Sequence, residues 1–120
     1  MNRSVYGKES QVKMGNAVKL GVEGLVSTEL KAANEKFPPF HSDHEGYAVI
    51  LEEVEELSEE INTVIKYNLE IAWRAVKASK PASAAENISN VEAAAIRAAC
   101  EAIQVAAMCR KFKGMEESPK

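Results

Sequence analysis

The sequence predicts an all-α protein, a bundle of three or four helices in a single domain that spans residues 1–120. The chain contains 18 Ala but only six Gly and four Pro, and runs of β-branched residues are scarce. Ala is the strongest helix former, whereas Gly and Pro are the weakest. A length of 120 residues suits one ordinary domain and is too short for two. This composition argues against a β-sandwich or a β-barrel.

The first helix is predicted over residues 8–36, after a polar start at residues 1–7 that we expect to be disordered. Apolar residues recur there at helical steps of three and four, namely Val18, Val22, Leu25, Val26 and Leu30. Three glycines in this stretch either weaken the helix or mark close packing against another helix. The helix ends at Phe37, because Pro38 disfavours the α conformation of the preceding residue.

The second helix is predicted to start at Asp43 behind a capping box formed by Ser42 and Glu45. Neither Gly nor Pro interrupts residues 47–80, so helical structure should persist to about Ser79. A helix of that length exceeds the usual range. We therefore expect a kink or short turn near Asn62 or Asn68.

The last helix is predicted from a second capping box at Ser89–Glu92 to about Lys113, after a linker over residues 81–89. Gly114 suits its end, and residues 115–120 are expected to be disordered. This helix is apolar on two sides, which indicates a central position in the fold or a subunit interface. In so short a chain we expect a homo-oligomer, either a dimer or a tetramer.

Several classes of protein are disfavoured by composition. A formal net charge of −3 makes the chain a poor binder of nucleic acid. No apolar run reaches the ~18 residues of a membrane span, and no charged-then-apolar leader opens the chain, so we expect a cytoplasmic protein without a membrane partner. Cys100 and Cys109, the only cysteines, are too few for a zinc site, and we expect no disulfide between them.

The second predicted helix concentrates acidic residues. No Lys or Arg occurs from Phe37 to Ile65, while the same span holds Asp43 and seven Glu. At about 100° per residue the glutamates fall on two flanks of the apolar stripe. One flank carries Glu53, Glu56 and Glu60, and the other carries Glu52, Glu55 and Glu59. Two carboxylates three residues apart can bind one Mg²⁺. The alternative is a solvated acidic face without a ligand.

Glu101 falls inside the apolar stripe of the last helix rather than opposite it. A buried carboxylate needs a partner or a metal ion, because its desolvation is costly. Gln104 points to the same flank one turn later. A surface pair between Glu101 and Arg97 is the structural alternative. The functional interpretation places Glu101 opposite Glu53 and Glu56, around a divalent cation.

Other functional motifs are weak or missing. The sequence has no Gly-rich phosphate loop, no G-x-S-x-G and no plausible Cys–His pair. It has no Glu-x-x-His, which disfavours a di-iron bundle of the ferritin type. His41 and His44 flank the start of the second helix, where histidines are more often structural than ligand-binding. Phe40 is nevertheless placed to stack on a base.

Two segments resemble the MazG-like proteins of the all-α nucleoside triphosphate pyrophosphohydrolase superfamily, most closely the phage- and prophage-type members. They are Phe37–Glu56, which reads FPPFHSDHEGYAVILEEVEE, and Glu101–Met108, which reads EAIQVAAM. The resemblance covers about residues 10–113. It implies an oligomeric helical bundle in which Glu-Glu-x-x-Glu on one helix and Glu-x-x-Asp on a later one bind Mg²⁺.

The resemblance implies hydrolysis of a nucleoside triphosphate to a monophosphate and pyrophosphate, with Mg²⁺, or Mn²⁺ in its place, as cofactor. Glu53, Glu56 and Glu101 would hold the metal, and Glu52 and Glu53 would be the catalytic residues. Gln104 would be a further ligand, at the position where the family has Asp. The substrate contacts expected from the residues are Phe40, His44, Arg97 and Lys111, with Arg110 as an alternative contact to the phosphates. The spacing between the two motifs is longer than is usual in the family.

The predicted function is therefore a Mg²⁺-dependent nucleoside triphosphate pyrophosphohydrolase. The alternative is a catalytically weak or inactive helical oligomer of the same fold that acts as a binding or structural protein. A third interpretation is an adaptor for an amphipathic partner helix. Two features discriminate between the first two interpretations. One is the presence of Gln104 in place of a carboxylate, and the other is the side to which Glu101 faces.

Overall fold

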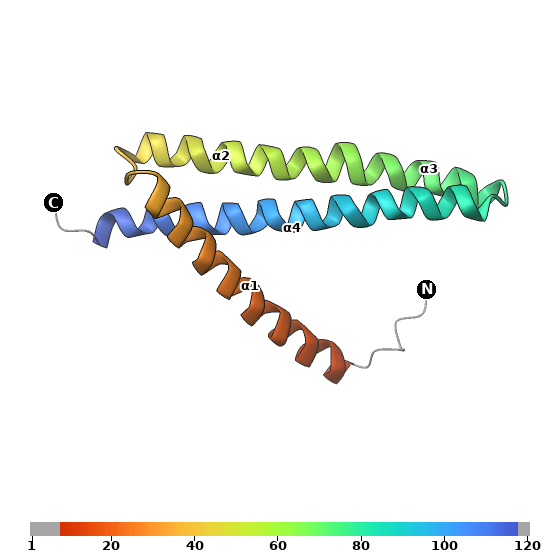
Figure 1. Cartoon of the computed structure of the whole chain (residues 1–120), viewed down its shortest axis with the longest axis horizontal. Coiled ribbons are helices and arrows are strands. Elements are labelled where there is room, and N and C mark those ends of the chain that lie inside the picture. Colours follow the sequence, from red (N-terminus) through yellow and green to blue (C-terminus); the bar gives the residue numbers. More distant parts are fainter. Residues whose placement is uncertain (1–7, 118–120) are drawn as a thin grey trace.

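The computed structural model describes residues 8–117, with side chains over residues 15–115, and within this range the chain is helical with no β-strand. The helices form three rods (Figure 1). The first is α1 (Lys8–Lys36), the second joins α2 (Asp43–Glu59), the π-helical segment η1 (Glu60–Ile65) and α3 (Lys66–Lys77), and the third is α4 (Pro81–Glu117). The all-α prediction is confirmed; the disorder predicted for residues 1–7 lies outside the described range.

The α2–η1–α3 rod and α4 run antiparallel and side by side along the length of the molecule (Figure 1). Small side chains line their contact, with Ala72, Ala75, Ala84, Ala94 and Ala98 all buried. Small residues let two helix backbones approach closely. No large side chain in the described range is fully buried. The two rods therefore form a thin hairpin rather than a layered core.

The start of α2 agrees with the predicted capping box in part. The Glu45 amide donates to Ser42 Oγ at 3.1 Å, as expected for an N-cap. The Glu45 carboxylate does not return to the Ser42 amide but accepts from the His41 amide at 2.8 Å. Gly46 lies buried just behind this cap. The loop at residues 37–42 is thereby fixed against the first turn of α2.

The break predicted near Asn62 or Asn68 is the π-helical segment η1, which contains Asn62. The rod passes through it and continues into α3 without a turn. A π segment adds one residue to a helical turn, and such segments are frequent at functional sites. Here η1 begins at Glu60, directly after the acidic part of α2. The π turn therefore influences how the Glu60 side chain is directed toward α4, where it pairs with Arg97.

The turn between α3 and α4 is tighter than the sequence suggested. Ser79 adopts the left-handed conformation, with φ of 56°. The amide of Lys80 donates to the Ala75 carbonyl at 2.9 Å and that of Ser79 to the Val76 carbonyl at 3.1 Å. These two bonds form a Schellman motif, which satisfies the last carbonyls of α3.

The linker predicted over residues 81–89 is wrong, because α4 already begins at Pro81. Proline suits the first position of a helix, where its missing N–H would have no partner. Ser89 therefore caps nothing, and the adjacent Asn90 instead donates to Asn68 Oδ1 on α3 at 3.1 Å. The predicted end is also too early: α4 continues through Gly114 to Glu117. Of the disordered tail predicted at residues 115–120, only 118–120 lie outside the described range.

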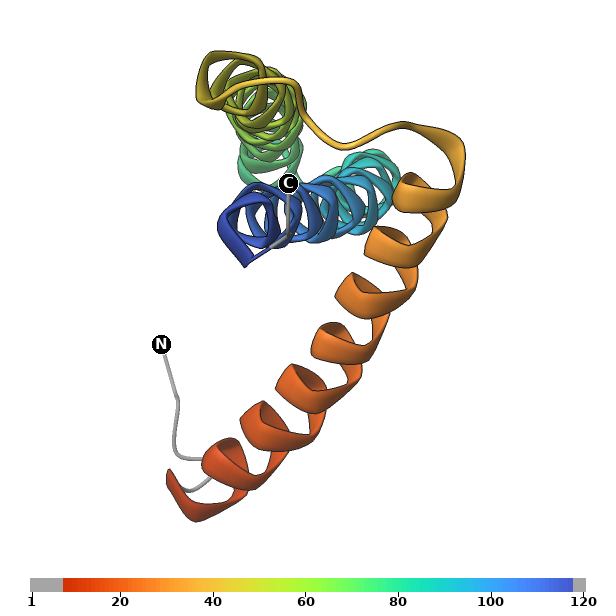
Figure 2. The ribbon, with the colours of Figure 1, turned by 90° about the vertical axis from the view of Figure 1, so that its left-hand side faces the viewer.

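The helix α1 touches the hairpin only through its C-terminal half. Val26 is buried, and Arg110 of α4 donates to Ser27 Oγ at 3.0 Å. Toward its N-terminus α1 leaves α4 at a steep angle and projects as an arm (Figures 1 and 2). The molecule consequently measures 63 × 34 × 20 Å. Within the described residues, no helix combines the length and apolar character needed to cross a membrane.

Candidate functional site

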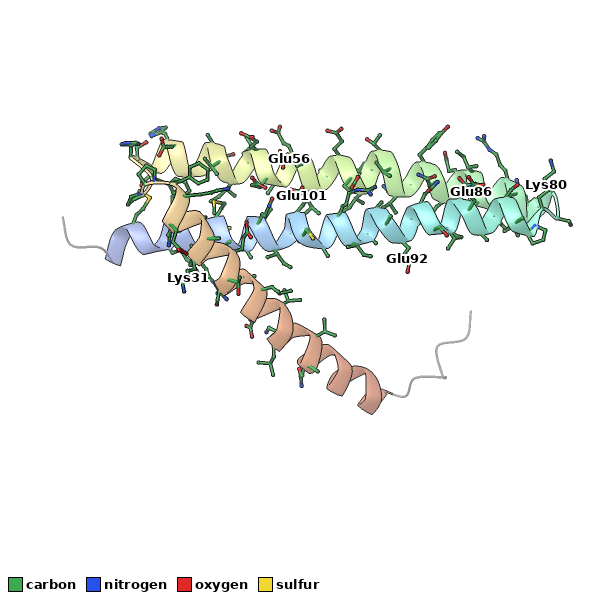
Figure 3. All side chains as sticks on the ribbon, viewed as in Figure 1. Lys31, Glu56, Lys80, Glu86, Glu92 and Glu101 are labelled. Atoms are coloured by element: carbon green, nitrogen blue, oxygen red, sulfur yellow. The ribbon has the colours of Figure 1, made fainter. Side chains whose placement is uncertain are left out.

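Three carboxylates predicted to converge lie together between the two rods. Glu53 and Glu56 extend from α2 and Glu101 from α4, and one oxygen of each lies within 4.8 Å of the others. Figure 3 shows Glu56 and Glu101 on the facing rods. Glu53 and Glu101 are half-buried, while Glu56 is exposed. Glu101 therefore faces the acidic helix, as the sequence predicted, and not open solvent.

Two of the three carboxylates, Glu53 and Glu56, have raised pKa values. The pKa of Glu53 is raised first by burial and then by the negative charges of Glu56 and Glu101. The pKa of Glu56 is raised by a hydrogen bond to Glu101, by the charge of Glu101 and by burial. Both shifts come in part from negative charges held close together, and a bound proton reduces that repulsion. A divalent cation relieves the same repulsion.

Gln104 joins this cluster through its amide. When the amide is oriented by its hydrogen bonds, its nitrogen donates to Glu53 Oε2 at 2.8 Å and to Glu101 Oε2 at 3.3 Å. Rotation of the amide by half a turn presents its oxygen to the same place. Gln104 can thus bridge two carboxylates without metal or offer a neutral oxygen to a cation.

These four oxygen-bearing side chains suit a hard divalent cation. Mg²⁺ and Mn²⁺ prefer carboxylate, carbonyl and water oxygens. A cation bound by all three carboxylates would draw their oxygens closer together than the 4.8 Å within which they now lie. One side of the cluster opens to solvent at Glu56, which leaves positions for water or a ligand.

A pocket of about 460 Å³ adjoins the cluster. It lies where the end of α1, the loop at residues 37–42, α2 and α4 meet. Glu53 and Gln104 form the wall that it shares with the carboxylates. The remaining wall is largely apolar and includes Phe37, Phe40 and Met108. An elongated ligand could therefore hold one end at the cluster and place a flat apolar part between the aromatic side chains.

Lys111 supplies a positive charge to this pocket. Its side chain is buried, and its ammonium nitrogen lies 4.8 Å from the centre of the Phe40 ring. Its charge also helps, after the effects of His41, to lower the pKa of Glu45. Among the hydrogen bonds and ion pairs of the described residues, none uses the Lys111 ammonium group. It therefore remains able to bind an acceptor in the pocket.

The two histidines near the cap differ in their relation to the pocket. His41 lines the pocket and pairs with Glu45 at 3.2 Å, whereas His44, one of the four substrate contacts that the sequence predicts, does not line it. Glu29 and Ala33 of α1 also line the pocket, and the sequence does not predict them. No local signal identifies them, because their contribution depends on where α1 crosses α4.

Arg97 and Glu52, two further residues predicted for the site, lie outside the group of converging carboxylates. Arg97 forms an ion pair with Glu60 at the start of η1, rather than with Glu101. Glu60 and Glu56 line a second hollow of about 330 Å³, together with Glu101. Glu52 is exposed and stands outside the converging group, although its charge contributes to the raised pKa of Glu53.

Comparisons with known proteins add no assignment. A scan against family models, a search of curated proteins and a search of solved structures each returned no match. A functional assignment therefore depends on the geometry of the site and on the resemblance of the two sequence segments to the MazG-like proteins.

Proposed function

We propose that this protein is a Mg²⁺-dependent nucleoside triphosphate pyrophosphohydrolase that releases a nucleoside monophosphate and pyrophosphate. The observation that carries the proposal is the convergence of Glu53, Glu56 and Glu101 from two helices. They are the three residues to which the MazG-like resemblance assigns the metal. The conditions of a cytoplasm, where Mg²⁺ and nucleotides are abundant, suit this activity.

The metal would be held by Glu53, Glu56 and Glu101, with the Gln104 oxygen as a neutral fourth donor. A bound divalent cation polarises phosphoryl oxygens and lowers the pKa of bound water, which favours phosphoanhydride hydrolysis. Glu53 belongs to the cluster and also lines the pocket, so its carboxylate could accept a hydrogen bond from the attacking water while it holds the metal. Glu52, exposed beside it, can orient water from the outer side.

The adjoining pocket supports a nucleotide as the substrate. Gln104 and Lys111 are seven residues apart on α4, a distance of about 10 Å along a helix. A triphosphate at the cluster would therefore leave the nucleoside in the apolar part of the pocket. There Phe37 and Phe40 offer surfaces for a base, and Lys111 offers a donor for a base carbonyl or a phosphate oxygen.

The second candidate function is a weak or inactive homologue of the same fold that binds nucleotide without hydrolysing it. The hydrogen bonds of Gln104 to Glu53 and Glu101 favour this alternative, because the amide already satisfies both carboxylates without metal. A neutral ligand also binds Mg²⁺ more weakly than a carboxylate. In either case we propose a homo-oligomer as the functional unit, with no nucleic-acid or membrane partner.

A pyrophosphate-release screen tests the proposal. The purified protein is incubated with the ribo- and deoxyribonucleoside triphosphates and either Mg²⁺ or Mn²⁺, and the products are separated. We expect monophosphate and pyrophosphate from at least one nucleotide, and loss of this activity in Glu101→Gln. Glu55→Gln, an exposed glutamate on the opposite flank, is the matched control and should retain activity.

Two outcomes contradict the proposed reaction. Formation of a nucleoside diphosphate and inorganic phosphate would place cleavage at the wrong anhydride. Equal activity in Glu101→Gln and the wild type would show that the converging carboxylates are not the site. Nucleotide binding without turnover of any nucleotide would instead favour the inactive alternative.

A further inference from the structure

The pocket beside the carboxylate cluster contains a lysine without a hydrogen-bonding partner. Lys111 is only 8% exposed, and its ammonium group takes part in no hydrogen bond or ion pair among the described residues. In the same part of the chain, every fully buried side-chain nitrogen or oxygen has a hydrogen-bond partner. The ammonium group is therefore not sealed inside the protein. It opens onto the pocket that Lys111 lines, where it can donate to an acceptor of a ligand.

The pocket also contains a carboxylate that is not engaged. Three glutamates line it, namely Glu29, Glu45 and Glu53. Glu45 accepts from the His41 amide, and Glu53 belongs to the converging carboxylates. The Glu29 carboxylate has no hydrogen bond or ion pair with any residue that the structure describes. Of the three, Glu29 is therefore the one that can accept hydrogen bonds from a ligand without losing a partner.

The sequence of α1 explains why Glu29 has no cation beside it. A glutamate on a helix pairs most readily with a charge three or four residues away. The residues at those steps are Leu25, Val26, Ala32 and Ala33, and none of them is charged. Glu29 is half-buried, one turn after Val26, which is itself buried. A carboxylate in this position favours a ligand that supplies hydrogen-bond donors, because it has lost part of its water without gaining a partner.

Lys111 lies where the nucleoside of the proposed substrate would bind. It is two turns of α4 beyond Gln104, about 10 Å from the wall that the pocket shares with the cluster. Its ammonium group lies beside the Phe40 ring, at the end of the pocket formed by the loop at residues 37–42. Glu29 lines the same pocket from the side of α1. With the phosphates held at the cluster, the ammonium group is therefore a contact for the base.

A guanine base matches one ammonium donor and one free carboxylate. Guanine presents two neighbouring donors, its ring N–H and its 2-amino group, which suit the two oxygens of a single carboxylate. Its keto oxygen and the nearby ring nitrogen are acceptors, and Lys commonly binds this pair in specific contacts with bases. Adenine carries an amino group in place of the keto oxygen, which an ammonium group disfavours. Cytosine and uracil lack the two neighbouring donors.

We propose that the pocket selects a guanine nucleotide. Glu29 accepts from the ring N–H and the 2-amino group, and Lys111 donates to the keto oxygen and the nearby ring nitrogen. This inference deepens the proposed function and rests on its placement of the nucleotide, with the phosphates at the cluster and the base in the pocket. It concerns recognition of the base, so it can be tested without turnover.

Calorimetric titration of the full chain with GMP, AMP, CMP and UMP in the presence of Mg²⁺ tests the preference. A monophosphate is a product of the proposed reaction, so none of these ligands is consumed. GMP should bind about tenfold or more tightly than the other three. IMP, which differs from GMP only by the missing 2-amino group, should bind about tenfold more weakly than GMP. This comparison needs no variant of the protein.

Two variants assign the contacts to residues. Glu29→Gln should remove the difference between GMP and IMP, because an amide does not offer two acceptors. Lys111→Met should narrow the difference between GMP and AMP, since the 6-amino group of AMP no longer meets a positive charge. Glu35→Gln is the matched control, because Glu35 is exposed on the same helix and does not line the pocket. It should bind all five nucleotides as the wild type does.

Four outcomes would overturn the proposal. They are equal binding of GMP and IMP by the wild type, a preference for another base, a GMP–IMP difference that survives in Glu29→Gln, and no binding of any monophosphate. The reaction stands or falls separately in the pyrophosphate-release screen. Turnover without a preference for guanine would uphold the reaction against this inference. Selective binding of GMP without turnover would uphold the inference against the reaction.

Discussion

At the residue scale, the central feature is the mutual repulsion of carboxylates that stand close together. Glu53 and Glu56 both have raised pKa values, from burial and from their acidic neighbours. A raised folded-state pKa means that the unfolded chain releases its protons first as pH rises. The folded state therefore loses stability from about the ordinary value of 4.5 upward through the raised pKa, and the loss is complete above it.

The first prediction concerns pH. Without metal, the melting temperature should fall as pH rises through this window, and Glu53→Gln should reduce that fall. Added Mg²⁺ should raise the melting temperature more at pH 7 than at pH 5, because protons compete for the same oxygens. Thermal melts at several pH values measure both effects. A metal response that is the same at both pH values would argue against these carboxylates as ligands.

Gln104 provides the second prediction. Gln104→Asp exchanges a neutral oxygen donor for a charged one and removes the hydrogen bonds to Glu53 and Glu101. We expect the metal-free protein to become less stable and Mg²⁺ to bind about tenfold more tightly. The stabilisation by metal should grow accordingly, since the ligand binds only the folded state. Melting curves across a Mg²⁺ titration separate the lower stability without metal from the larger stabilisation by metal. If Gln104→Asp and the wild type respond to Mg²⁺ identically, Gln104 is not part of the site.

At the element scale, the start of α2 depends on a glycine. A Cβ at Gly46 would meet the Phe112 ring at 2.5 Å and the Phe40 ring at 3.0 Å. Gly46→Ala should therefore cost about 1–3 kcal/mol of stability through overpacking, although Ala is the better helix former. Gly24→Ala on α1, where no atom lies within 4 Å, is the control and should stabilise by up to about 1 kcal/mol. Denaturant unfolding measures both; destabilisation of the two variants by equal amounts would refute this packing argument.

The elements also show which features local sequence determines. The end of α1 and the start of α2 were predictable because a proline loop marks the first and a Ser N-cap the second. The start of α4 was not, because Ser89 and Glu92 imitate a capping box inside a helix. Tertiary packing determines the start of α4. Ala84 and Ala94 are buried against the neighbouring rod, and this burial stabilises the helical conformation of residues 81–89.

The candidate site likewise combines residues that the sequence identifies with residues that only the tertiary fold brings in. Spacing placed Glu53 and Glu56 on one helix flank and Glu101 inside an apolar stripe, and the MazG-like resemblance implied these three as the metal ligands. The pocket could not be predicted, since Glu29 and Ala33 enter it only through the crossing of α1 over α4. The path of the loop likewise determines that His41 and not His44 lines the pocket.

At the scale of the whole molecule, a thin hairpin of two rods carries the candidate site, and the arm of α1 projects from it (Figure 1). The carboxylates are held by two long helices rather than by loops. Such rigid support suits a metal site, whose ligands must stay within a few tenths of an ångström of their positions. The pocket beside the cluster is bounded by the part of α1 nearest the hairpin.

Direct measurement of Mn²⁺ binding tests the central claim, that Glu53, Glu56 and Glu101 form a divalent metal site. Electron paramagnetic resonance counts free Mn²⁺ during titration of the wild type, Glu56→Gln, Glu101→Gln and the control Glu55→Gln. We predict saturable binding in the wild type and control, and affinity lower by about tenfold or more in the other two variants. Binding of equal strength in all four proteins, or in none, would contradict the account.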